Sequence, residues 1–317
     1  MIVIQILIFV LSVFLLTLSG KWLIKSLKRI AEFLGWKEFV VAFFITAFSV
    51  SLPNFFVGII SALNKVPELS FGDIIGGNVV ELALLGGLAA FFSKKGLSAN
   101  SKTVQGSSIF AIVTAILPLV LCADGNLSRS DGIVLISAFV LYVLWLFNKK
   151  ERFEKVYDEI RGRIGVRFVF ETTIIFIISV FFLLLSAKGV VESARSFASY
   201  LHIPIALVGI LIVSLGNSVP DLTFVLQAAR KSNDWFILGD LIGGTIITAT
   251  LVLGIVSLIS PIKTTNIPSI IIGRIFLIIA ALFFLFFIKT DRKISRKEGL
   301  FLISIYIVFL VLEILIK

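Results

Sequence analysis

The chain has 317 residues, of which 58% are hydrophobic and 15% are charged, and its mean hydropathy is +1.10. Soluble domains carry about a quarter of charged residues, so this composition excludes a soluble enzyme, a soluble nucleic-acid binder and a disulfide-stapled secreted domain. Apolar stretches long enough to cross a bilayer recur from end to end. We therefore predict an all-α polytopic membrane protein.

Ten apolar segments follow one another, and each is predicted to be a transmembrane helix. They cover residues 2–19, 39–63, 71–92, 104–122, 132–148, 168–187, 204–229, 235–259, 268–288 and 299–316. Residues 1–148 form a first half of five helices and residues 168–317 a second half, together one integrated membrane domain. The polar stretch 149–167 is predicted to be a cytoplasmic linker, with a short surface helix as the alternative. The first segment has no basic stretch before it, so we expect a retained helix rather than a signal peptide.

Basic residues are unevenly distributed between the loops. Loops after odd-numbered segments hold 22 of the 29 Lys and Arg residues, and the other side holds 7. The positive-inside rule then predicts that both termini are extracellular and that the protein lies in the cell membrane. Topology accounts for the net charge of +10 without nucleic acid as a partner, and the expected partner is the lipid bilayer.

Cysteine and histidine chemistry is nearly absent. Cys122 and His202 are the single residues of their types. We therefore expect no intrachain disulfide, no histidine-based zinc site and no Ser-His-Asp triad. We expect no enzymatic activity and no cofactor.

The chain contains an internal repeat. Residues 41–87 align without a gap to the residues 167 positions later, with 12 identities. The most specific matches are a Ser-x-Pro motif and a Gly-Asp-x-Ile-Gly-Gly motif, which begin at Ser51, Ser218, Gly72 and Gly239. Five helices per half is an odd number, so the second copy enters the membrane from the opposite side. Such inverted repeats are typical of secondary transporters, with a site near the midplane, and the prolines and glycine pairs predict broken helices there.

Four carboxylic acids lie in the repeated segments, namely Asp73, Glu81, Asp221 and Asp240. An ionisable residue at membrane depth is costly and marks a candidate functional site. Hydroxyl and amide groups on the same segments add oxygen atoms, which are the ligands of hard cations such as Na⁺ and Ca²⁺. Two alternatives stay open. Asp73 and Asp240 could be helix-start residues stabilised by the macrodipole, and Glu81 and Asp221 could be neutral acids that hold helices together.

Residues 39–62 with 71–87, and residues 208–231 with 238–254, resemble the two alpha-repeats of the sodium/calcium exchanger family, part of the cation/Ca²⁺ antiporter superfamily. The two repeats would extend over about 39–92 and 204–259. The resemblance implies ten transmembrane helices arranged as two inverted five-helix repeats. It also implies that transported cations are the ligands.

The family pattern, similar to G-T-S-L-P-E followed by G-N-x-I-G-S-N-x-x-N or -D, implies which residues face the ion. The four central ligands would be Asn54, Glu81, Asp221 and Thr248. The other candidates are Ser51 and Ser218, which match the motif serines, together with Asn217, Asp73 and Asp240. The chain departs from the pattern where Asn54 replaces a carboxylate and where Val50, Gly77 and Gly244 lack a hydroxyl group.

These features predict a secondary active antiporter that exchanges Ca²⁺ or a related hard cation against Na⁺ or H⁺ by alternating access. The alternative is a membrane protein with the exchanger fold but without coupled exchange, such as a cation channel, a sensor or a partner-binding protein. An intramembrane aspartyl protease is disfavoured, because Ser70 and Ile237 stand where such enzymes need glycine. The sequence leaves the ion, the coupling ratio and the oligomeric state open, and it is compatible with a monomer.

Overall fold

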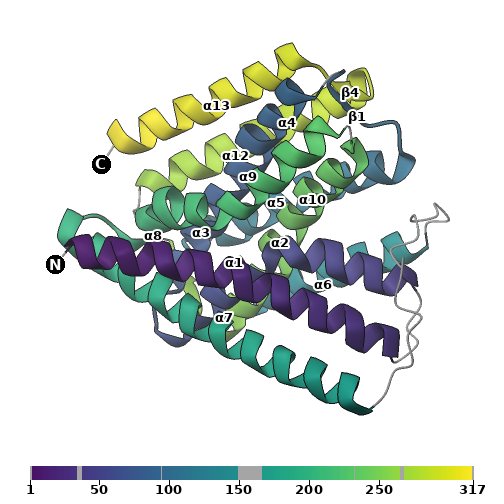
Figure 1. Ribbon diagram of the computed structural model, residues 1–317. Coiled ribbons are helices and arrows are strands. Elements are labelled where there is room, and N and C mark those ends of the chain that lie inside the picture. The colour runs from purple at the N-terminus through teal and green to yellow at the C-terminus, as the bar shows by residue number, and fades with distance from the viewer. Residues whose placement is uncertain are drawn as a thin grey trace.

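The computed structural model describes residues 2–33, 38–93, 95–148, 166–231, 233–264 and 268–315. These residues form one bundle of helices (Figure 1). Within the described residues, nine helical segments are long and apolar enough to cross a membrane. A tenth helix, α2, spans 26 residues, and its stretch Ser51–Leu63 is apolar. The prediction of ten transmembrane helices is confirmed.

Each half contributes five helical rods, some of them built from several consecutive elements. The first half contains α1 (Ile2–Phe33), α2 (Glu38–Leu63), α3 (Pro67–Val79) with η1 (Val80–Leu85) and α4 (Gly86–Phe92), α5 (Lys102–Leu121) and α6 (Arg129–Phe147). The second contains α7 (Val166–Leu201), α8 (Ile205–Val208) with η3 (Gly209–Val213) and α9 (Ser214–Arg230), α10 (Asp234–Ile247) with η4 (Thr248–Val252) and α11 (Leu253–Ile259), α12 (Pro268–Thr290) and α13 (Arg296–Leu315). The connections hold β1 (Leu97–Ser98), the 3₁₀ turn η2 (Cys122–Asp124), β2 (Asn126–Leu127), β3 (Ile262–Lys263) and β4 (Lys293–Ile294).

The first helix of each half is longer than its predicted span. α1 has 32 residues and α7 has 36, whereas the apolar segments cover only 2–19 and 168–187. Helical structure continues past the apolar segment because long basic side chains such as Lys21 and Lys25 can reach water from a membrane helix. Most of the predicted linker 149–167 lies outside the described residues. The described chain resumes at Val166, where α7 begins.

α1 and α7 lie side by side and run in opposite directions (Figure 1). A buried serine recurs at every seventh position of both helices, and the two sets are 167 residues apart: Ser12, Ser19, Ser26, Ser179, Ser186 and Ser193. The helices approach closely at Gly189, where an added Cβ would lie 2.1 Å from Ser12 Oγ. Small side chains permit such contacts between membrane helices. The repeat therefore extends to the first helix of each half.

The predicted breaks at proline and at the glycine pairs are wrong. α2 continues past Pro53, α9 continues past Pro220, and both glycine pairs lie inside regular helix. The irregularities are instead the π-helical segments η1, η3 and η4, each within a continuous rod. The glycines serve close packing, since a Cβ on Gly72 would lie 2.1 Å from the Ala206 carbonyl oxygen.

The two halves interlock through their last helices. α13 packs against α4, where Gly87 and Gly299 meet backbone to backbone, and α6 packs against α11 at Gly132 and Gly254. The two contacts are equivalent, because Gly254 and Gly299 follow their counterparts by 167 residues. The antiparallel pairs β1 with β4 and β2 with β3 join the same partners. Each half therefore completes the packing of the other.

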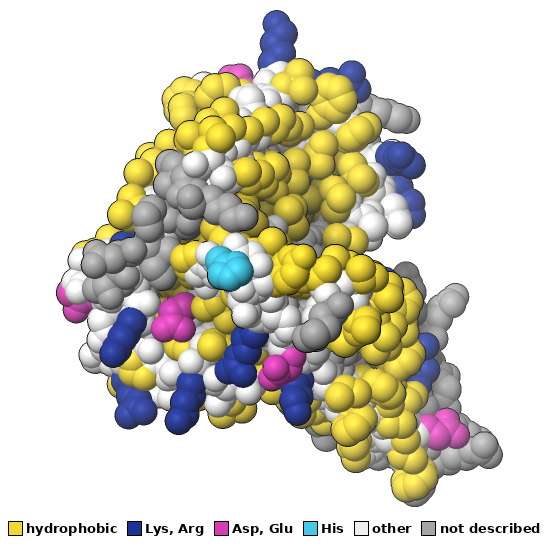
Figure 2. Space-filling model, turned by 90° about the vertical axis from the view of Figure 1, so that its left-hand side faces the viewer, with side chains coloured by type: hydrophobic (Ala, Val, Ile, Leu, Met, Phe, Trp, Pro, Cys, Tyr) yellow, Lys and Arg dark blue, Asp and Glu magenta, His cyan; other side chains and the backbone are white. Residues whose placement is uncertain are grey.

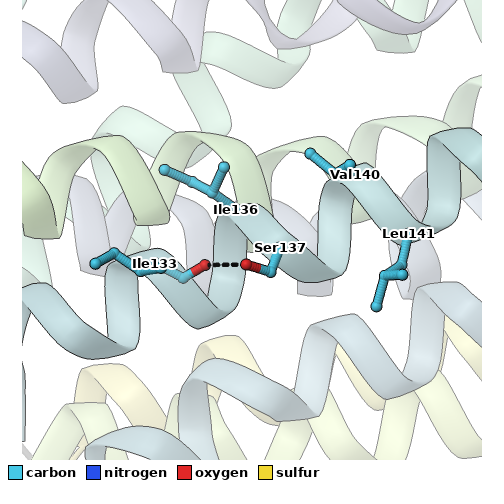
Figure 3. A pocket seen from close by; sticks show the side chains of 5 residues that line it. All are labelled: Ile133, Ile136, Ser137, Val140 and Leu141. Carbon is cyan, nitrogen blue, oxygen red and sulfur yellow. Dashed lines mark hydrogen bonds between the residues drawn. The ribbon is translucent and has the colours of Figure 1, made fainter.

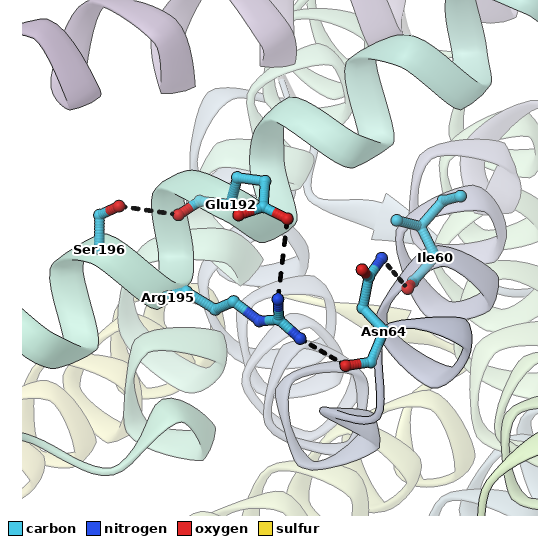
Figure 4. A network of polar contacts seen from close by, with 5 residues as sticks. All are labelled: Ile60, Asn64, Glu192, Arg195 and Ser196. Carbon is cyan, nitrogen blue, oxygen red and sulfur yellow. Dashed lines mark hydrogen bonds and ion pairs between the residues drawn. The ribbon is translucent and has the colours of Figure 1, made fainter.

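One end of the bundle is the side on which α1 begins and α13 ends (Figure 1). Lys and Arg side chains, interspersed with Asp and Glu, gather over the lower part of this face, and hydrophobic side chains cover its flanks (Figure 2). Arg195 near the end of α7 donates a hydrogen bond to the Asn64 carbonyl oxygen in the turn after α2, and lies 3.7 Å from the Glu192 carboxylate (Figure 4). This contact joins α7 to the α2–α3 turn.

We expect Gly87→Ala to destabilise the bundle, because the new Cβ would lie 2.6 Å from the Gly299 carbonyl oxygen. Overpacking of this kind costs about 1–3 kcal/mol, so thermal unfolding of the purified protein should occur at a lower temperature. The control is Gly20→Ala, whose Cβ has no heavy atom within 4 Å. Equal unfolding temperatures for the two variants would contradict the interlocked packing.

Candidate ion-binding site

The candidate residues lie on four neighbouring rods, two from each repeat. α2 carries Ser51 and Asn54, and the α3–η1 segment carries Asp73, Asn78 and Glu81. α9 carries Asn217, Ser218 and Asp221, and the α10–η4 segment carries Asp240, Thr245 and Thr248. All of these side chains are buried except that of Asp221, which is half-buried. Polar groups from both repeats thus gather inside the bundle.

Asn217 connects three of the rods. Its Nδ2 atom donates to Asn54 Oδ1 at 2.8 Å and lies 3.2 and 3.1 Å from the two carboxylate oxygens of Asp73. The Oδ1 atom of Asn217 is buried and has no hydrogen-bond partner. The amide therefore uses its donor end within the protein and leaves its acceptor end available.

Glu81 reaches across to the second repeat. Thr245 Oγ1 lies 3.0 Å from Glu81 Oε2, within hydrogen-bond distance. The carboxylate rests on the backbone of Gly244, where an added Cβ would be 3.1 and 3.2 Å from its two oxygens. The missing side chain at Gly244 therefore makes room for the Glu81 carboxylate.

A second contact between the repeats joins Thr248 and Asn78. Thr248 Oγ1 lies 2.8 Å from Asn78 Oδ1. The offset of 167 residues makes this pair the counterpart of Glu81 and Thr245, with the roles of the two repeats exchanged. At the glycine equivalent to Gly244, namely Gly77, an added Cβ would meet no heavy atom within 4 Å. Thr248, which is shorter than Glu81, thus leaves space beside Gly77, whereas Glu81 fills the equivalent space beside Gly244.

Several buried polar atoms in this region have no hydrogen-bond partner. They are Asp240 Oδ2, Asn217 Oδ1 and Asn78 Nδ2. Buried groups without partners are rare and require an explanation. Two of the three atoms, Asp240 Oδ2 and Asn217 Oδ1, are acceptors and favour a bound cation, whereas Asn78 Nδ2 is a donor and does not.

The two serines of the Ser-x-Pro motifs are both buried. Ser218 Oγ donates to the Ser214 carbonyl oxygen of its own helix at 2.7 Å. A hydroxyl group that donates its proton to the backbone retains lone pairs for a cation. Ser218 can therefore pack within its helix and still supply an oxygen ligand.

The helix-start alternative for Asp73 and Asp240 is wrong. Each is the seventh residue of its helix, α3 or α10, whereas the macrodipole acts mainly on the first turn. The predicted central residues Asn54, Glu81, Asp221 and Thr248 lie on the four neighbouring rods. The hydrogen-bond contacts of Asn54, Glu81 and Thr248 join them to other side chains and not to one another. Sequence reasoning missed Thr245 and Gly244 as the partners of Glu81, although the repeat offset pairs them with Asn78 and Gly77.

The carboxylates of the described residues do not form a metal site by themselves, and a pocket on α6 lacks charged ligands. No group of three or more His, Cys, Asp and Glu side chains in the described part of the chain could hold a metal ion, so a cation would need amide and hydroxyl oxygens as well. The pocket on α6 is lined by Ile133, Ile136, Ser137, Val140 and Leu141 (Figure 3). Ser137 carries the one hydroxyl group among these side chains, and it donates to the Ile133 carbonyl oxygen at 2.8 Å. The other lining side chains are apolar.

Comparison with known proteins matches the architecture and the repeated motifs. The family described as sodium/calcium exchanger protein matches residues 4–148 and 171–315, one stretch in each half. The chain belongs to the sodium/calcium exchanger family. This exchanger is therefore an integral membrane transporter and not an enzyme, and its fold consists of two inverted repeats.

Relatives of the exchanger cover nearly the whole chain. An uncharacterized membrane protein of Methanocaldococcus jannaschii is 27% identical over 302 residues, which are 95% of each chain. Sodium/calcium exchanger MaX1 of Methanosarcina acetivorans is 25% identical, with 98% of this chain and 99% of the relative covered. A structure of the sodium-calcium exchanger NCX_Mj, soaked with 10 mM Na⁺ and 10 mM Sr²⁺, has a TM-score of 0.66 at 25% identity over 98% of this chain and 99% of that chain.

We predict that serine substitutions at the two equivalent glycines of the exchanger have different effects. Gly244→Ser should displace the Glu81 carboxylate and weaken Ca²⁺ binding about tenfold, which corresponds to about 1.4 kcal/mol. Gly77→Ser is the matched control and should leave binding nearly unchanged, because its Cβ enters open space. Stabilisation of the purified protein by Ca²⁺ against thermal unfolding measures both affinities. Equal effects of the two substitutions would show that Gly244 does not set the position of Glu81.

Proposed function

We propose that this protein is a secondary active cation antiporter. It exchanges Ca²⁺ or a related hard cation against Na⁺ or H⁺ by alternating access through a site formed by both repeats. The observation that carries this proposal is the buried set of oxygen atoms to which both repeats contribute, with Glu81 of the first repeat bonded to Thr245 of the second.

The ligand chemistry supports a hard cation. Glu81 and Asp221 supply one carboxylate from each repeat, and together they balance the charge of a divalent ion. Asn54 and Thr248 add neutral oxygens. The other candidate ligands are Ser51, Ser218, Asn217, Asp73 and Asp240. Carboxylate, amide and hydroxyl oxygens are the ligands that Ca²⁺ takes, usually six to eight of them. The names of the relative MaX1 and of NCX_Mj point to the same class of ion.

The contacts between the repeats support alternating access. Glu81 with Thr245 and Asn78 with Thr248 join opposite halves directly at the site. Inverted repeats that rock against each other expose a central site to each side in turn. Movement of one half against the other would change these contacts, so binding of the ion and rearrangement of the halves would be coupled.

We further propose that both termini are extracellular and that the protein lies in the cell membrane. The excess of basic residues in the loops after odd-numbered helices supports this orientation. The start of α1 and the end of α13 lie on the same side of the bundle (Figure 1).

Transport should depend on an ion gradient and on both carboxylates. In proteoliposomes, an outward Na⁺ or H⁺ gradient should drive ⁴⁵Ca²⁺ uptake, and the double variant Glu81→Gln with Asp221→Asn should lower the uptake rate about tenfold or more, since each substitution removes a charged ligand. Glu192→Gln, far along α7 at the exposed end, is the control. Unchanged uptake in the double variant would reject Glu81 and Asp221 as ligands. Uptake that does not depend on either gradient would favour the alternative that the protein is a cation channel.

The orientation is testable in intact cells with a maleimide that does not cross membranes. Lys65→Cys, in the exposed α2–α3 turn, should be labelled, and Lys231→Cys, at the exposed end after α9, should not. The native Cys122 is buried and should contribute little background. The reverse labelling pattern would place both termini inside the cell.

A further inference from the structure

Three oxygen atoms from two helices converge on a single nitrogen atom inside the exchanger. Asn54 Oδ1 and both carboxylate oxygens of Asp73 lie 2.8 to 3.2 Å from Asn217 Nδ2. The exposed fractions of the three side chains are 7%, 1% and 4% for Asn54, Asp73 and Asn217. The cluster is therefore almost fully withdrawn from solvent.

The arrangement of these oxygens is typical of a cation site. A bidentate carboxylate together with an amide carbonyl is a common part of the shell around a hard cation. Here the amide nitrogen occupies the centre instead. One of its two hydrogen atoms can be donated to Asn54 Oδ1, and the other can be shared by the two carboxylate oxygens of Asp73. The side chain thus supplies partial positive charge where an ion would supply a full charge.

The equivalent position in the first repeat is different. The offset of 167 residues pairs Asn217 with Val50, Asp73 with Asp240 and Asn54 with Asp221. Valine has no hydrogen-bond donor in its side chain, and the buried Asp240 Oδ2 atom has no hydrogen-bond partner. One of the two equivalent sets of positions therefore contains an amide donor, and the other contains two aspartates and a valine.

We propose that the Asn217 amide takes the place of a monovalent cation between Asp73 and Asn54. Asn217 is then a residue that determines ion specificity. The consequence of this inference rests on the proposed exchange function. With the amide between Asp73 and Asn54, the protein would exchange one monovalent ion fewer than it would if a cation could bind there. Removal of the amide should create a monovalent-cation site from residues that are already in place.

The test compares Na⁺ binding by the purified full-length protein and its variants, read as Na⁺-dependent stabilisation against thermal unfolding, with choline as the inert cation. Asn217→Thr and Asn217→Ala should respond to Na⁺ at concentrations about tenfold lower than the wild type, since a buried carboxylate then gains a charged partner. Asn100→Thr, at an exposed asparagine, is the matched control and should behave as the wild type. Folded Asn217 variants with an unchanged Na⁺ response would overturn the proposal.

A third variant keeps the proposal testable if Asn217→Thr and Asn217→Ala prevent folding. Asn217→Asp has the same shape as the native residue and replaces the amide donor by a carboxylate oxygen, so it should also respond to Na⁺ at lower concentrations than the wild type. A folded Asn217→Asp variant with an unchanged Na⁺ response would overturn the proposal. The Na⁺ comparison does not require transport, so it tests this proposal independently of the exchange function. A Ca²⁺ titration of the wild type in the same assay shows separately whether the proposed function fails.

Discussion

The contact between α3 and the α8–η3 segment holds the two repeats at the distance that the polar contacts in the site require. Backbone meets backbone there. A Cβ on Gly76 would lie 2.3 Å from the Ile210 carbonyl oxygen, and one on Gly209 would lie 2.4 Å from that of Leu69. Membrane helices gain little from the hydrophobic effect when they associate, so close packing of small residues is a main source of their stability. Because the helices touch at Gly72, the next residue, Asp73, lies within reach of Asn217.

The second constraint is that polar groups away from water need partners. Each carboxylate withdrawn from solvent costs free energy unless a donor, a proton or a cation compensates it. Asp73 has the Asn217 amide and Glu81 has the Thr245 hydroxyl, and both contacts cross from one repeat to the other. The same few side chains therefore join the repeats and line the candidate site. A substitution at one of them would therefore change both the packing of the halves and the candidate site.

The duplicated backbone carries two different sets of side chains. Glu81 in one repeat corresponds to Thr248 in the other. Gly244 is covered by the Glu81 carboxylate, whereas the equivalent Gly77 has open space beside it. The Asp73 cluster contains an amide donor, and the Asp240 carboxylate has an oxygen without a partner. An inverted repeat places equivalent residues symmetrically, but each substitution changes one side alone. The site is consequently asymmetric in charge although the fold is symmetric.

The sequence by itself determined the class of the protein, the number of membrane helices, the repeat and the region of the site. These follow from local composition and from identities at one fixed offset, which need no knowledge of distances between helices. Only the tertiary structure decided which side chains meet. The offset names equivalent positions, but the pairing of Glu81 with Thr245, or of α13 with α4, depends on the rotation and spacing of helices distant in the chain. That the helices continue past Pro53 and Pro220 was likewise decided by the tertiary structure, since neighbouring groups can satisfy the backbone atoms that proline frees.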